Sequence, residues 1–161
     1  MPKQLPLTYK HNNCQINAYI NMRNHYKNKS LTLVFGSLGI NGWFEYGGKN
    51  WSVNDFKKKI DGYSSDCHCW LEDDKGNVYD YLHEEYNNWV LFRTKRKMKR
   101  TGLIEGVSKK DLANDGIEYI PASFEAQKLL FLSIFDLLWE IEIGLKKGTH
   151  GWLGTHIYKK I

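Results

Sequence analysis

The amino-acid sequence predicts a single α+β domain over residues 1–161, in which helices pack against a mainly antiparallel sheet. Its length suits one hydrophobic core and is too short for two independent ones. Segments with apolar residues at helical spacing alternate with short segments rich in β-branched and aromatic residues. One pair of the short segments flanks a tight polar turn, which is typical of an antiparallel hairpin.

The first half of the chain is expected to begin with a helix near Asn12 or Asn13, because Asn is a good N-cap residue and apolar stems follow at helical spacing. Residues 30–40 and 42–48 have the composition of short strands broken by glycines. A loose capping-box pattern predicts a short helix over residues 53–60.

The hairpin follows, with strands over residues 67–72 and 77–82 around the turn "DDKG". Residues 87–95 are expected to form a third strand. A long, mostly buried helix is predicted over residues 123–147, with Ser123 as its N-cap and Gly148 as its stop. The tail "GWLGTHIYKKI" could supply a last edge strand.

Composition limits the function classes. Hydrophobic residues make up 42% of the chain, which argues against disorder. The three cysteines cannot all pair, and no secretory signal precedes them, so we expect free thiols in the cytoplasm. The longest apolar run is too short to cross a bilayer, so no membrane partner is expected. Small size and absent targeting also suit a protein of a virus or phage that acts in the host cytoplasm.

Three residues suggest cysteine chemistry. Cys14 falls in the first turn of the expected helix, where free N–H groups and the helix dipole favour a thiolate. A histidine in reach can take the thiol proton and return it to a leaving group, while a carboxylate orients its ring. His68 and Asp80 are the candidates for these two roles.

The hairpin geometry supports the pairing of His68 with Asp80. A three-residue loop would pair Asp73 with Asn77, so Trp70 would lie opposite Asp80, with His68 one diagonal step away on the same face. A loop of two or four residues would put them on opposite faces. Gly76 favours the three-residue loop, whose last residue is left-handed.

The order of Cys14 in "NCQINA", His68 in "HCWLE" and Asp80 in "GNVYD" resembles the papain-like fold of cysteine hydrolases, and most closely the transglutaminase-like cysteine proteinase group. The resemblance covers roughly the first half of the chain. It implies a nucleophilic Cys14, with His68 as general base and acid and Asp80 as its orienter. The usual Gln before the Cys is missing, so Asn13 or main-chain N–H groups are the candidate oxyanion donors.

The expected function is acyl transfer through this triad: hydrolysis of an amide or isopeptide bond in a protein or peptide, or deamidation or transglutamination through the same thioester. Trp70 would wall the site and exclude water. No cofactor and no metal are expected, because Cys67 and Cys69 point away from His68 on a strand and are expected to pack in the core.

The alternative function is a non-catalytic binding module of the same fold. The net charge of +5 is concentrated in "RTKRKMKR", residues 93–100. This segment could hold an anionic partner, a nucleotide or a nucleic acid, although a solvated loop or strand edge is the explanation that a single basic cluster favours. Its candidate anion-binding residues are Lys95, Arg96, Lys97, Lys99 and Arg100.

Overall fold

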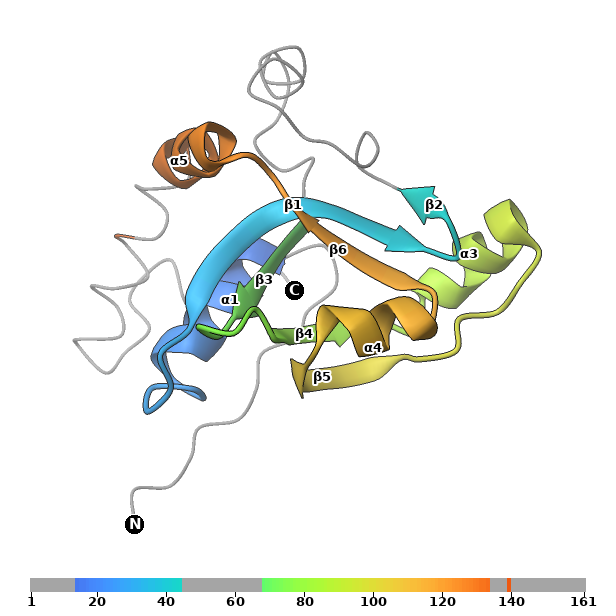
Figure 1. Ribbon diagram of the computed structural model, residues 1–161, viewed down its shortest axis with the longest axis horizontal. Coiled ribbons are helices and arrows are strands. Elements are labelled where there is room, and N and C mark those ends of the chain that lie inside the picture. The colour runs from blue at the N-terminus through green and yellow to red at the C-terminus, as the bar shows by residue number, and fades with distance from the viewer. Residues whose placement is uncertain (1–13, 45–67, 134–138, 140–161) are drawn as a thin grey trace, which may run out of the picture.

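The computed structural model describes residues 14–44, 68–133 and 139, and within them it is an α+β protein with a curled antiparallel sheet (Figure 1). The described strands are β1 (Thr32–Ile40), β2 (Trp43–Phe44), β3 (His68–Glu72), β4 (Val78–Leu82), β5 (Gly102–Val107) and β6 (Ile117–Pro121). The described helices are α1 (Cys14–Arg23), α3 (Tyr86–Thr94), α4 (Lys109–Asn114) and α5 (Phe124–Ser133).

Strand β1 organises the sheet. The strands follow the order β2-β1-β3-β4-β5, and β6 also pairs with β1. Residues Thr32–Gly36 of β1 pair with β3, and residues Gly36–Ile40 pair with β6. Figure 1 shows β1 as a long curved strand with β3 and β6 both running beside it. Gly36 is therefore shared by two pairings and lies opposite both His68 and Pro121.

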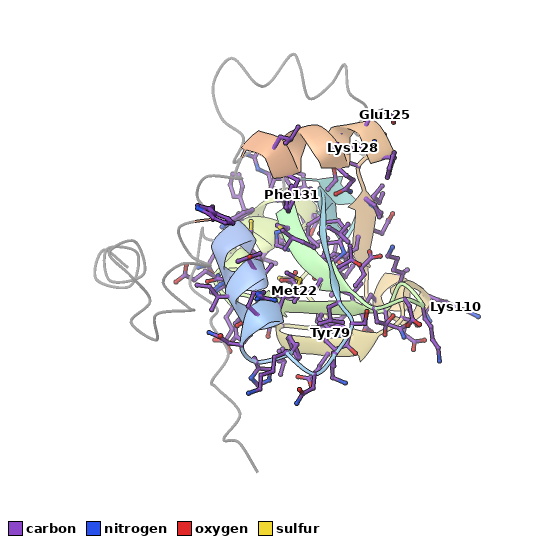
Figure 2. All side chains as sticks on the ribbon, turned by 90° about the vertical axis from the view of Figure 1, so that its left-hand side faces the viewer. Met22, Tyr79, Lys110, Glu125, Lys128 and Phe131 are labelled. Carbon is purple, nitrogen blue, oxygen red and sulfur yellow. The ribbon has the colours of Figure 1, made fainter. Side chains whose placement is uncertain are left out.

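The helices cover opposite sides of the strands. Helix α1 packs against β3 through buried residues such as Ala18 and Ile20, and α4 lies on the other side of the sheet (Figures 1 and 2). Ser108 caps α4 by accepting a hydrogen bond from the Asp111 N–H. The core on the α4 side contains the buried side chains Val34, Trp70, Val78, Leu82, Val90, Ile104, Leu112 and Ile117.

The predicted hairpin is confirmed, including its register. Leu71 lies opposite Tyr79 and Glu72 opposite Val78, and the Asp73 N–H donates to the Asn77 carbonyl at 3.1 Å. The loop therefore contains three residues. Gly76 closes it with φ of +79°, a left-handed conformation that glycine adopts without a steric penalty.

The expectation of a strand over residues 87–95 is wrong, because this segment belongs to helix α3. Tyr86 and Val90, four residues apart, are both buried, whereas Leu91 and Phe92 are exposed. That is the spacing of one helical face rather than the alternation of a strand. Lys95 ends the helix in a left-handed conformation, and its N–H bonds the Leu91 carbonyl.

Helix α5 begins where predicted, since the Ser123 hydroxyl accepts a hydrogen bond from the Ala126 N–H at 3.3 Å. Its described part, Phe124–Ser133, is not mostly buried as expected, because Phe124 and Leu132 are exposed. Most of the predicted extension to residue 147, the expected helix over residues 53–60 and the tail strand lie outside the described residues. Strands β5 and β6 and helix α4 were not predicted.

No helix in the described part of the chain has the length and apolar content needed to span a membrane.

Candidate active site

His68 is the centre of the site, and the hairpin places it. It is the first residue of β3 and only 2% exposed. Its Nε2 lies 2.6 Å from Oδ2 of Asp80 on the neighbouring strand β4. This contact is the diagonal one that a three-residue loop allows, so the register of the hairpin sets the distance between the two side chains.

Cys14 reaches His68 from helix α1. The side chain of Cys14 is both a hydrogen-bond partner and a charge partner of the imidazole. Because Nε2 is engaged by Asp80, Nδ1 is the ring nitrogen left for the thiol. The three residues named from the sequence are thus in one chain of contacts, with the imidazole between the sulfur and the carboxylate.

The electrostatics of His68 follow from these two partners. Burial lowers the pKa of the imidazole, but the charge and hydrogen bond of Asp80, together with Cys14, outweigh burial and raise the pKa to about 10. At neutral pH the ring is therefore an imidazolium, and both of its N–H groups donate. An imidazolium beside a thiol stabilises the thiolate, which is the reactive form of cysteine.

A fourth residue, Tyr119, was missed by the sequence analysis. It lies on β6, and its hydroxyl donates to Asp80 Oδ2 at 2.7 Å, the same oxygen that receives His68 Nε2. The sequence signal was weak: "IEYIP" alternates buried Ile117 and Tyr119 with more exposed neighbours, which is typical of a strand ended by proline. Nothing local indicates that β6 pairs with β1.

Trp70 lies beside the imidazole and is fully buried. The two rings are nearly parallel, with centroids 5.9 Å apart. The indole N–H donates to Glu72 Oε1 at 2.9 Å, and the Lys109 ammonium group of α4 lies 2.7 Å from the same oxygen. Trp70 therefore forms an apolar wall of the site, and the hydrogen bond from its indole N–H to Glu72 fixes the orientation of the ring.

Gly36 makes room for this wall. A Cβ atom built on Gly36 would lie 2.8 Å from the far edge of the Trp70 ring and would collide with the main-chain carbonyl of Ile120. Any side chain here would displace the Trp70 ring or separate β1 from β6.

The remaining predicted residues are placed as follows. Asn13 and Cys67 lie outside the described residues. Cys69 is buried, as expected. Among the residues that the structure describes, no group of three His, Cys, Asp or Glu side chains is arranged to hold a metal ion.

The basic segment begins with Arg93 and Thr94, the last two residues of α3, and continues as a fixed loop. The Asn41 side-chain amide donates to the main-chain carbonyls of Arg96 and Lys97 at 3.2 and 3.3 Å, and Met98 is buried beneath the loop. Arg100 pairs with Asp115 at 3.0 Å. The loop carries the exposed side chains Lys95, Arg96, Lys97 and Lys99.

Comparisons with known proteins do not identify the chain: no protein-family model, no curated protein and no solved structure matches it.

Proposed function

We propose that the protein is a cysteine-dependent acyl-transfer enzyme, in which Cys14 is the nucleophile, His68 the general base and acid, and Asp80 the residue that orients His68. The observation that carries this proposal is the position of the buried imidazole, which is hydrogen-bonded to a thiol on one side and to a carboxylate on the other. A cysteine, a histidine and an orienting acid in this order are the elements of nucleophilic catalysis by a thiol.

The reaction follows from these contacts. In the resting site Nδ1 of His68 already holds the proton of the Cys14 thiol, and the thiolate attacks the carbonyl carbon of an amide. The tetrahedral intermediate collapses when His68 returns the proton to the leaving amine, which leaves a thioester on Cys14. Water then attacks the thioester while His68 accepts its proton, and the acid is released. An amine in place of water gives transamidation.

Asp80 and Trp70 have supporting roles in this scheme. The carboxylate holds Nε2–H, so Nδ1 faces the sulfur throughout the cycle. Trp70 covers one face of the ring and keeps water from it. Asn13 or main-chain N–H groups beside Cys14 remain the predicted donors to the oxyanion. The same proposal includes three further points. The substrate is a protein or peptide amide, and the fold is papain-like or transglutaminase-like. The protein acts in the cytoplasm, as a viral protein would in its host.

The test is the rate at which iodoacetamide alkylates Cys14, measured against pH by peptide mass spectrometry in the wild type and in His68→Ala. We expect Cys14 to react faster at pH 6 to 7 than an ordinary thiol, and we expect the variant to lose at least about tenfold in rate there, because the imidazolium no longer stabilises the thiolate. His83→Ala is the matched control and should leave the rate unchanged. Equal rates in wild type and His68→Ala would refute the proposal.

The binding module is the second candidate, and the fixed basic loop favours it. The side chain of Phe92 is exposed, and the charged groups of Lys95 and Arg93 lie 5.3 and 5.7 Å from the centroid of its ring. Cations beside an exposed aromatic ring can bind phosphates and stack on bases. An anisotropy titration with a labelled oligo-dT probe tests it. Binding that is lost in a Lys95→Glu, Lys97→Glu, Lys99→Glu variant but kept in Cys14→Ala favours the binding module, provided that Cys14 also fails the alkylation test.

A further inference from the structure

We infer that Tyr119 is a positioning residue for the proposed triad: its hydroxyl fixes Asp80 as a two-fold hydrogen-bond acceptor and so restrains the proton that His68 holds on Nε2. The inference rests on the proposed function. It adds a fourth side chain from a strand that enters the site through the pairing of β6 with β1.

The first step is that Tyr119 can act only as a donor here. It is 4% exposed, and its pKa is raised well above the ordinary value of a phenol by burial and by the charge of Asp80. The phenol therefore keeps its proton at all working pH values. Since its hydroxyl lies 2.7 Å from Oδ2, the proton points at the carboxylate.

The second step is that the two donors share one oxygen. His68 Nε2 and the Tyr119 hydroxyl lie 2.6 and 2.7 Å from Asp80 Oδ2. Both distances are those of charge-assisted hydrogen bonds. An oxygen that accepts two such bonds shares its negative charge between two donors, so each of the two hydrogen bonds is weaker than a single one would be. Tyr119 thereby weakens the hydrogen bond between Asp80 and the Nε2–H group of His68.

The third step concerns geometry. The Tyr119 ring packs against Trp70 with centroids 5.1 Å apart and against His68 at 6.1 Å. The hydroxyl cannot turn away without moving these rings. Tyr119 therefore holds Asp80 from β6 while His68 holds it from β3, so the carboxylate of β4 is fixed by side chains of two other strands.

Other titratable and charged groups lie near the site: Cys14, Tyr26, Tyr86 and Arg100. Cys14 of α1 and Asp80 of β4 both raise the pKa of His68. Tyr86 of α3 raises the pKa of Tyr119, and Arg100 lowers it. None of these groups supplies a second donor to Asp80 Oδ2 among the described hydrogen bonds, so the effect of removing the Tyr119 hydroxyl can be assigned to this one bond.

The experiment is an NMR titration of His68 in full-length protein carrying ¹³C-labelled histidine, with the His68 signal assigned from the spectrum of His68→Ala. In Tyr119→Phe we expect the His68 midpoint to rise by about half a unit to one unit, because Asp80 Oδ2 then accepts only the hydrogen bond from Nε2, and that bond to the protonated ring becomes stronger. Tyr26→Phe is the matched control. It also loses a phenol that donates to a carboxylate, Glu105 at 3.1 Å, and it should leave the midpoint unchanged.

A midpoint that does not move in Tyr119→Phe, or that moves equally in Tyr26→Phe, overturns the inference. If Tyr119→Phe does not fold, 3-fluorotyrosine at position 119 keeps the ring and hydroxyl but makes the latter a stronger donor. The His68 midpoint should then fall, and an unchanged value again overturns the inference. Alkylation of Cys14 in the wild type reports separately on the proposed function, so a failure of either idea is distinguishable from a failure of the other.

Discussion

Glu72 and Lys109 join the hairpin to helix α4, with the ammonium group 2.7 Å from Oε1 of the carboxylate. The same oxygen accepts the indole N–H of Trp70 at 2.9 Å. The ion pair is partly exposed, whereas Trp70 is fully buried. The hydrogen bond from Trp70 should therefore contribute more to the free energy of unfolding than the ion pair with Lys109.

Glu72→Ala is expected to lower the free energy of unfolding by about 1–3 kcal/mol, because it leaves a buried indole N–H without an acceptor. Lys109→Ala should cost less, about 0–1 kcal/mol, as for other solvent-screened ion pairs. Urea unfolding followed by tryptophan fluorescence measures both. Equal losses in the two variants would show that Trp70 does not depend on Glu72.

Gly36→Ala is expected to destabilise the protein by about 1–3 kcal/mol or more, as overpacking of a close contact does. The added methyl group meets the Ile120 carbonyl and the Trp70 ring. Gly42→Ala is the control, since a Cβ there meets no atom within 4 Å and only backbone strain remains. The idea fails if chemical denaturation finds Gly36→Ala no worse than Gly42→Ala.

The stability of the protein should depend on pH through His68. The folded state keeps the imidazole protonated up to its raised pKa of about 10, whereas the unfolded chain releases this proton near the ordinary value of 6.5. Between these values the unfolded state binds fewer protons. The contribution is thus fully present below pH 6.5 and is lost toward pH 10, at up to about 1.4 kcal/mol per pH unit.

Asp80→Asn tests this dependence, because it removes the charge that raises the His68 pKa. Urea unfolding at several pH values between 6.5 and 10 should show a shallower slope than in the wild type. Asp115→Asn removes a more exposed carboxylate, paired with Arg100, and should keep the wild-type slope. A wild-type slope in Asp80→Asn would contradict the assignment.

Asp73→Ala should loosen the turn that sets the hairpin register. The carboxylate accepts hydrogen bonds from the main-chain N–H groups of Lys75 and Asn77 at 3.0 and 2.9 Å. Hydrogen exchange of these two amides should accelerate in the variant. Exchange of the Gly76 amide, which bonds the Asp73 main-chain carbonyl instead, is the internal reference. Unchanged exchange at Lys75 and Asn77 would show that the carboxylate is dispensable.

Local rules were enough to predict the hairpin. A three-residue loop with a left-handed glycine has one register, and that register determines which side chains share a face. The contact between His68 and Asp80 followed from counting residues. Cys14 was harder to place, because no local rule brings a helix end to a strand, and the resemblance to papain-like hydrolases provided the expectation.

The misses have a different origin. Residues 87–95 contain β-branched and aromatic types that favour strands, but the burial of Tyr86 and Val90 against the core selects a helix. Tyr119 depends on the pairing of β6 with β1, whose partners are far apart in the sequence. Propensity and turn chemistry contain no information about such a contact.

The double pairing of Gly36 has a consequence for the order of folding. Pairing of β3 with β4 is local, so His68 and Asp80 can meet early, whereas β6 must find β1 across a long stretch of chain. A refolding molecule should thus pass through a stage in which the imidazole and carboxylate are together but Tyr119 is absent. The reactivity of the Cys14 thiol would then reach its final value later than the hydrophobic collapse of the chain. The time course of that reactivity would report when β6 joins the sheet.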